Sequence, residues 1–242
     1  LHKAIRRQRQ MCIRDSYGRD VLVRVAAFDL DGTIIDGESP LKLTTSLLRH
    51  RQLPVHKAIL MGIWGIRYRL RLPQVESTPR ELLFSALTSS TVEEVDEEIM
   101  DVFNRRIRKR IRPGAIREIK RCREDGMKVV LASASFKPIT TTIVEELGFD
   151  GQVSTIMEEK DDHYTGKVVG VPVQGREKLR LLIQLCDDMF GSRNWVLERA
   201  YSDHYSDIPM LELANEVTVI DPDKKLERVA KKRGWQIVDW DS

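Results

Sequence analysis

The sequence predicts an α/β fold in which helices cover both faces of a parallel β-sheet, making a three-layer core, and an all-helical segment is inserted after the first strand. Three observations predict it. An apolar run near the N-terminus ends in two aspartates, strand-like and helix-like segments alternate over the C-terminal half, and the stretch between them has a helical pattern. The expected domains are a core of residues 21–36 and 112–242 and an inserted helical domain of 37–111.

The first predicted strand is residues 21–28, a mostly apolar run rich in valine. Continuous apolar runs of this length are typical of strands that are buried on both faces of a parallel sheet. The run leads directly into Asp29-Leu30-Asp31-Gly32-Thr33. Because open α/β sheets bind their ligands at the carboxyl ends of strands, these aspartates are candidate site residues.

The rest of the core alternates between two kinds of segment. Such alternation indicates strands joined by crossover helices, and therefore a parallel sheet covered on both sides. The expected strands are 128–132, 151–156, 199–201 and 217–220, and the expected helices are 115–124, 139–147, 177–186, 209–214 and 225–233.

The inserted domain has its clearest helix at its end. Thr91-Val92-Glu93-Glu94 has the form of a capping box, and apolar residues then recur at helical spacing as far as Ile111. The start of this helix is acidic and residues 105–110 are basic, which matches the helix dipole. A nucleic-acid patch is the alternative interpretation of the basic cluster, but a solvated helix end explains it better.

Composition and charge narrow the class of protein. The chain has 242 residues, 41% hydrophobic and 32% charged, and no apolar run approaches the roughly 18 residues that cross a bilayer. The net charge is +3, but residues 1–20 alone contribute +4, so no nucleic-acid partner is expected. Those residues are expected to be a disordered tail or an artefact. Three cysteines without metal-type spacing, and no secretory signal, predict a cytoplasmic protein.

Asp29 and Asp31 form the first candidate constellation. Side chains two residues apart on an extended strand end point to the same side, and two adjacent carboxylates need a cation or a shared proton. Carboxylate oxygens suit Mg²⁺. Gly32 permits a sharp turn, and the hydroxyl of Thr33 can donate a hydrogen bond to an oxyanion. The alternative is a merely polar turn after a strand.

Two further elements can bind phosphate oxygens. Ser133 follows a buried strand, and its hydroxyl and the backbone N–H of Ala134 lie near the start of a helix, although an ST-turn closing the strand is an equal alternative. Lys178 opens the predicted helix 177–186 and can neutralise phosphate as a point charge. Taken alone, Lys178 would be interpreted as a surface residue.

The last element is the segment 200–211, in which Asp203 and Asp207 follow a short strand. These acids can complete a metal site begun by Asp29 and Asp31. The alternative role of Asp207 is to cap the helix that Pro209 opens. His204 is a conceivable base, but a solvent-facing loop histidine is the better interpretation.

Taken in order, these four elements resemble the haloacid dehalogenase superfamily of phosphohydrolases. The Asp-x-x-x-Asp-x-Pro-Met-Leu form, and a helical insert between the first two motifs, are most similar to the phosphoserine-phosphatase-like branch. The resemblance extends over about residues 21–240. It implies a Rossmann-like core, a helical cap formed by the insert, Mg²⁺ as cofactor, and a small phosphomonoester as substrate.

The resemblance also implies roles. Asp29 would be the nucleophile that forms an aspartyl-phosphate, and Asp31 would protonate the leaving oxygen and then activate water. The Asp29 carboxylate, the Asp31 backbone carbonyl and Asp203 would hold Mg²⁺, and Asp207 would orient this shell. Ser133, Ala134, Thr33 and Lys178 would bind the phosphoryl group. An aspartate at position 31 favours phosphate esters, because members that cleave carbon–halogen bonds generally lack it.

Substrate choice is expected to depend on the cap. Glu38 corresponds to the glutamate with which phosphoserine phosphatases meet the substrate amine, and Arg67 or Arg80 are guesses for the carboxylate partner. Glycerol-type or lipid-type phosphates are also considered, because the aromatic and basic segment 63–71 could touch a membrane surface, although packing of cap helices explains it at least as well. A phosphotransferase or mutase, or a non-catalytic binding protein on this fold, are the alternative functions. No pattern in the sequence indicates an oligomeric state.

Overall fold

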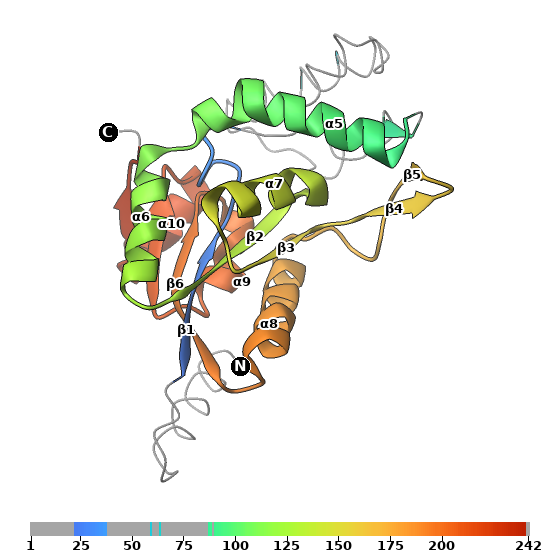
Figure 1. Cartoon of the computed structure of the whole chain (residues 1–242). Coiled ribbons are helices and arrows are strands. Elements are labelled where there is room, and N and C mark those ends of the chain that lie inside the picture. The colour runs from blue at the N-terminus through green and yellow to red at the C-terminus, as the bar shows by residue number, and fades with distance from the viewer. Residues whose placement is uncertain (1–21, 38–58, 60–62, 64–86, 89, 241–242) are drawn as a thin grey trace.

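A six-stranded parallel sheet forms the centre of the computed structural model, which describes residues 22–37, 59, 63, 87–88 and 90–240. The strand order is β3-β2-β1-β6-β7-β8, so β1 lies in the middle (Figure 1). The strands are β1 (Val23–Phe28), β2 (Lys128–Phe136), β3 (Gly151–Thr155), β6 (Trp195–Ser202), β7 (Glu216–Ile220) and β8 (Gln236–Val238). The predicted parallel α/β core is confirmed.

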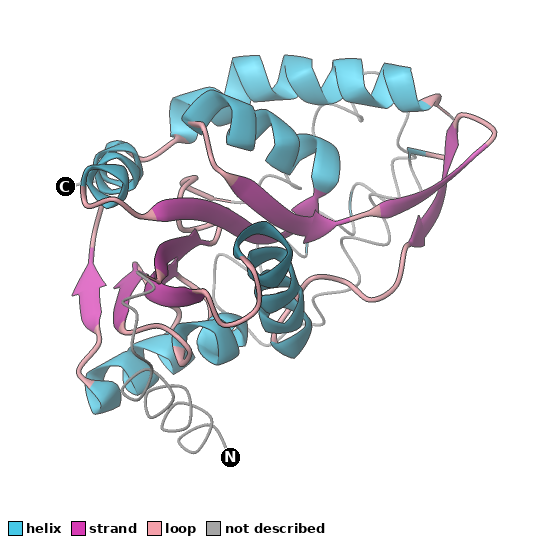
Figure 2. Cartoon of the chain, turned by 60° about the horizontal axis from the view of Figure 1, so that its bottom comes forward, coloured by secondary structure: helices cyan, strands magenta, loops and turns pink. Residues whose placement is uncertain are grey.

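Alternating residues of β1 divide the core into two halves. Val25 and Ala27 pack with α8 (Arg176–Phe190), α9 (Ile208–Leu211) and α10 (Lys224–Arg233), whereas Ala26 and Phe28 pack on the side of α6 (Pro113–Glu124) and α7 (Lys137–Leu147). All four side chains are fully buried. Figure 2 shows the strands between the two groups of helices. A continuous apolar strand is required because both of its faces are covered.

A tight turn follows β1 and leads the chain out of the core. The carbonyl of Leu30 accepts hydrogen bonds from the backbone N–H groups of Ile34 (2.9 Å) and Ile35 (3.0 Å). Ile35 then pairs with Ile111 in an antiparallel bridge, and the N–H of Asp36 donates to the carbonyl of Arg110 (2.8 Å). The two ends of the predicted insert are therefore side by side where they meet the core.

The described end of the insert is helical as predicted. Helix α5 (Val92–Val102) begins with the expected capping box, in which Thr91 and Glu94 bond each other's backbone N–H. It continues as a π-helical turn (Phe103–Ile107) and a 3₁₀ turn (Arg108–Arg110). The expectation that the helical pattern runs to Ile111 is wrong, because Ile111 is extended and pairs with Ile35. Most of the predicted cap, residues 38–86, lies outside the described residues apart from positions 59 and 63.

The basic end of this helix makes ion pairs within the chain. Arg105 pairs with Asp101, Arg108 with Glu146 of α7, and Arg110 with Asp36. These arginine side chains are exposed. The interpretation as a solvated helix end therefore accounts for the cluster.

A β-hairpin between β3 and α8 was not expected from the sequence. It consists of β4 (Met157–Lys160) and β5 (His163–Val168), and its tip contains Asp161 and Asp162 with positive φ. The tip reaches the start of α5, where the N–H of Val92 donates to the carbonyl of Asp162 (2.9 Å) (Figure 1). Its strands are short and mostly polar, so no alternating pattern reveals them. Strand β8 was also missed.

Smaller differences concern element ends. Strand β6 begins at Trp195, earlier than the expected 199, and α9 ends at Leu211, earlier than the expected 214. No helix in the described part of the chain is both long enough and apolar enough to cross a membrane.

Candidate active site

The first strand fixes the position of Asp29 at the centre of the sheet. The backbone N–H of Asp29 donates to the carbonyl of Tyr201 (3.0 Å), which extends the pairing of β1 with β6 by one residue. The ring of Tyr201 stacks on Phe28, with centroids 4.1 Å apart. Because β1 pairs with β2 on one side and β6 on the other, the crossovers diverge here, and such a switch point is where open α/β sheets bind ligands.

Lys178 reaches Asp29 from the first turn of α8. Its Nζ lies 2.8 Å from Oδ1 of Asp29 and 2.7 Å from Oδ2 of Asp207, and the residue is 2% exposed. The alternative of a surface lysine is therefore wrong. Burial opposes the charge of this ammonium, but Asp207 and Asp29 outweigh it and raise the pKa of Lys178 above its ordinary value. A cation in the first turn of a helix is also unfavourable for the dipole, so the two carboxylates must offset that cost.

The negative charge around Asp29 exceeds what Lys178 can balance. Burial raises the pKa of Asp29 from 3.8 to about 7; Lys178 opposes this shift, and the charges of Asp207 and Asp31 add to it. Asp29 is 7% exposed and Asp207 is 1% exposed. Since buried like charges are costly, the arrangement favours a further cation at this end of the sheet.

Asp203 follows β6 and packs against the turn after β1. Its Oδ1 accepts a hydrogen bond from the hydroxyl of Thr33 (3.2 Å). A Cβ atom at Gly32 would lie 2.0 Å from Oδ2 of Asp203, and Gly32 has φ +78°, so only glycine permits this approach. Thr33, which is expected to contact phosphate, donates its hydroxyl hydrogen to the Asp203 carboxylate in this structure, and its contact with phosphate stays a prediction.

Asp207, four residues after Asp203, is also buried. Its Oδ2 accepts hydrogen bonds from Lys178 and from the hydroxyl of Ser202 (2.8 Å), while its Oδ1 is buried with no hydrogen-bond partner among the described residues. Asp207 precedes α9, but its side chain makes no capping hydrogen bond there. The capping alternative is therefore wrong, and the carboxylate faces the site.

Ser133 and Ala134 lie in the last part of β2, which continues to Phe136 rather than ending at the expected residue 132. The N–H of Ser135 donates to Oγ of Ser133 (3.0 Å), so the ST-turn considered as an alternative is formed. The hydroxyl of Thr155 donates to the carbonyl of Ala134 (2.8 Å), and the hydroxyl of Ser135 donates to Oδ2 of Asp31. An ST-turn of this kind uses Ser133 Oγ as an acceptor, so its hydrogen can still be donated to a ligand.

Three further polar residues support the acids or the backbone of the phosphate-binding segment and were not predicted from the sequence. Ser135, Thr155 and Ser202 are all buried, and each makes a hydrogen bond in or next to the site. A weak signal existed for two of them: Ser135 lies two residues after Ser133, and Ser202 directly precedes Asp203. Thr155 lies far from the motifs in sequence, and only the pairing of β2 with β3 brings it to them.

Among the described residues, the side chain of His204 contacts Ser206 and Asp223 rather than the Asp29 and Asp31 carboxylates. Its Nδ1 lies 2.9 Å from Oγ of Ser206, and Nε2 lies 3.9 Å from Oδ2 of Asp223. The side chain is 22% exposed, so the expectation of a solvent-facing histidine is correct only in part. These contacts shape the loop after Asp203.

The acids fit a divalent cation bound through few side chains. No group of three or more His, Cys, Asp or Glu side chains in the described residues is arranged as a metal cluster. The expected ligands include only two carboxylates, those of Asp29 and Asp203, with the backbone carbonyl of Asp31. The excess negative charge, the close approach that Gly32 permits and the buried Oδ1 of Asp207 all suit such a cation.

Glu38, Arg67 and Arg80, the residues considered for contacts with the substrate, lie outside the described residues.

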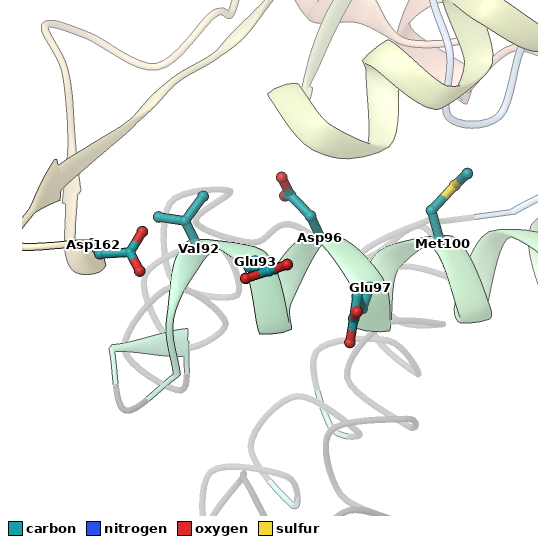
Figure 3. A pocket seen from close by; sticks show the side chains of 6 residues that line it. All are labelled: Val92, Glu93, Asp96, Glu97, Met100 and Asp162. Carbon is teal, nitrogen blue, oxygen red and sulfur yellow. The ribbon is translucent and has the colours of Figure 1, made fainter.

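A hollow of about 610 Å³ lies between α5 and the hairpin tip. Figure 3 shows its lining: Val92, Glu93, Asp96, Glu97 and Met100 from α5, and Asp162 from the tip. Burial and the charge of Glu159 raise the pKa of Asp96. Four of these six side chains are acidic, so the hollow would repel a phosphate ester, and the strand ends remain the candidate site.

Comparison with known proteins finds one family over most of the chain. A family model described as haloacid dehalogenase-like hydrolase matches residues 26–212. Phosphoserine phosphatase SerB1 of Mycobacterium tuberculosis is 27% identical over 90% of this chain and 71% of its own length. The inhibition of morphological differentiation protein of Streptomyces azureus is 31% identical over 90% of this chain and 79% of its own.

A solved structure has the same fold. A Bordetella pertussis protein of unknown function has a TM-score of 0.79 at 23% identity, and the match covers 91% of this chain and all of that one.

Proposed function

The chain belongs to the haloacid dehalogenase-like hydrolase family and is a phosphatase, and we propose that it is a Mg²⁺-dependent phosphomonoesterase acting through Asp29. The observation that carries the proposal is the buried contact of Lys178 with Asp29 and Asp207 at the carboxyl end of β1. A buried carboxylate beside a lysine, at the switch point of a parallel sheet, suits attack on an anionic group whose charge the lysine offsets.

In the first step, an oxygen of Asp29 attacks phosphorus and the bond between phosphorus and the ester oxygen breaks. Lys178 binds Oδ1 of Asp29, so we assign the attack to Oδ2. The departing oxygen takes a proton from the carboxyl group of Asp31. The product is an aspartyl-phosphate on Asp29 and a free alcohol.

In the second step, water attacks the phosphorus of the aspartyl-phosphate. The Asp31 carboxylate takes a proton from that water, which restores Asp31 to its starting state, and the bond from Asp29 to phosphorus breaks. The hydroxyl of Ser133, the N–H of Ala134 and Lys178 bind the phosphoryl oxygens in both steps. Asp29, Asp203 and the Asp31 carbonyl would hold Mg²⁺, which when bound would supply positive charge to offset the repulsion between the anionic ester and the carboxylate.

For the substrate, we propose a small phosphorylated metabolite of the phosphoserine type. A relative at 27% identity is named a phosphoserine phosphatase, and Glu38 is the residue expected to meet an amine. Glu38→Gln should then raise KM for phosphoserine several-fold and leave KM for glycerol phosphate unchanged. Equal effects on both esters would contradict the assignment.

The experiment that tests the activity measures phosphate release from phosphoserine, sugar phosphates, glycerol phosphates and lysophosphatidate, with Mg²⁺ or with a chelator. Wild type should need Mg²⁺, and Asp29→Ala and the isosteric Asp29→Asn should each lose at least about 1,000-fold in kcat. Circular dichroism of both variants would check that they fold. Metal-independent release, or release that survives Asp29→Asn, would overturn the mechanism.

A further inference from the structure

The hydroxyl of Ser135 donates a hydrogen bond to Oδ2 of Asp31. Ser135 lies on β2 and is 5% exposed, whereas Asp31 lies in the turn after β1 and is partly exposed. The two residues are 104 positions apart in the sequence. A hydroxyl bonded to a carboxylate is a charge-assisted contact, about twice as strong as a neutral one.

Ser135 is itself held in place by neighbouring residues of β2, the strand that carries the phosphate-binding groups Ser133 and Ala134. Its backbone N–H donates to Oγ of Ser133 (3.0 Å), and the neighbouring carbonyl of Ala134 accepts from Thr155 of β3. The hydroxyl of Thr155 also accepts from the N–H of Val173 (3.3 Å), which ties the end of β2 to the segment before α8. The backbone around Ser135 is therefore held by two neighbouring elements, so the Ser135 hydroxyl has a fixed position from which to orient Asp31.

We propose that Ser135 is a positioning residue for Asp31, an inference that rests on the proposed phosphatase function. Its bond to Oδ2 fixes the orientation of the carboxyl group, and we assign the exchange of the proton to Oδ1. When the bond between phosphorus and the ester oxygen breaks, the electron pair stays on that oxygen, and the proton of Asp31 passes to it from Oδ1. In the second step the same oxygen takes a proton from the attacking water.

The proposal predicts a dependence on the leaving group. An alkoxide leaves poorly unless it is protonated, whereas 4-nitrophenolate leaves without a proton. A loss of Asp31 orientation should therefore slow phosphoryl transfer from an alkyl phosphate and scarcely affect transfer from an aryl phosphate. The loss of a residue that only binds phosphate or stabilises the end of β2 would slow transfer from both esters alike.

The test compares kcat/KM for phosphoserine or glycerol phosphate with kcat/KM for 4-nitrophenyl phosphate, whichever alkyl ester the wild type hydrolyses. The value of kcat/KM reports the steps up to the transfer of the phosphoryl group to Asp29, and it excludes the later hydrolysis of the aspartyl-phosphate. General acid catalysis contributes about 100- to 10,000-fold, so Ser135→Ala should lower kcat/KM for the alkyl ester about 10- to 100-fold and for the aryl ester less than about 3-fold.

Two further variants separate positioning from a structural role. Ser135→Thr keeps the hydroxyl and should restore most of the alkyl-ester activity lost in Ser135→Ala. Thr155→Val removes the buried hydroxyl on β3 that holds the carbonyl of Ala134, whose N–H is assigned to phosphate binding, so its loss should affect both esters and not the alkyl ester alone.

Equal losses for both esters in Ser135→Ala, or no loss for either, would overturn the positioning role while leaving the phosphatase function intact. Failure of folded wild-type protein to release phosphate from any ester would overturn the proposed function and this inference with it.

Discussion

Two acid-rich regions of this molecule differ in burial and in what lies beside them. At the strand ends, Asp29 and Asp207 are buried and share Lys178. On α5, the carboxylates around Asp96 face a hollow, and Asp96 itself is exposed. Burial raises the pKa of Asp29 to about 7, and burial together with the charge of Glu159 also raises the pKa of Asp96. Several carboxylates close together are therefore not enough to indicate an active site. Carboxylates that are buried beside a fixed positive charge are the stronger indication.

The largest expected effect comes from removing that counter-charge. Lys178→Met should lower kcat at least about 100-fold, because one charged group that stabilises the phosphoryl transition state is lost. It should also lower the free energy of unfolding by about 3–5 kcal/mol, because a buried ion pair would be broken from one side. Urea denaturation without Mg²⁺ measures this loss of stability.

Arg105→Met is the control from the α5 region, where the Arg105–Asp101 pair is exposed. Its loss should cost less than about 1 kcal/mol. Similar costs for the two variants would contradict the contrast between the regions.

The second effect is a pH dependence of metal-free stability. The folded-state pKa of Asp29, about 7, exceeds its ordinary value of 3.8, so the folded state binds more protons between these values. The free energy of unfolding should therefore fall as pH rises from about 4 to about 7, with a slope contribution of up to about 1.4 kcal/mol per pH unit. The measurement is urea denaturation in a chelator for wild type and Asp29→Asn, whose difference isolates this carboxyl. A difference that is flat with pH would show that Asp29 stays ionised throughout.

A third and smaller effect is expected at Gly32, where Asp203 approaches the turn after β1. Gly32→Ala should cost about 1–3 kcal/mol and raise the Mg²⁺ concentration needed for half-maximal activity, because its Cβ would meet the Asp203 carboxylate at 2.0 Å. Gly126→Ala is a matched control: φ is +77° there against +78° at Gly32, and nothing lies within 4 Å of its added Cβ. If both variants need the same Mg²⁺ concentration, the contact does not shape the metal site.

The smallest effect is expected on α5. Asp96→Asn should change kcat less than about 2-fold and stability by no more than about 0.5 kcal/mol, as for other exposed positions. Any stability change should be a gain, because burial and Glu159 already favour the neutral form of this carboxyl. Activity assays and thermal unfolding check both points. A large loss of phosphatase activity would mean that the acidic hollow belongs to the site.

Local patterns in the sequence are enough to predict the α/β core and the order of the site residues. The apolar run of β1 and the Thr91 capping box depend on neighbours a few residues apart, so local pattern suffices to predict them. Asp29, Ser133 and Asp203 each follow a predicted strand, and the carboxyl ends of parallel strands meet at one edge of a sheet, so the pattern is consistent with a shared site.

Only the tertiary structure decided which of these groups touch. The bond from Ser135 to Asp31 spans 104 positions, and that from Lys178 to Asp29 spans 149. Such contacts depend on strand register and on the rotation of α8, which no local pattern encodes. For the same reason Ile111, helical in its spacing, is extended where it meets Ile35. The hairpin of β4 and β5 was missed because its short polar strands acquire a partner in α5 only once the chain has folded.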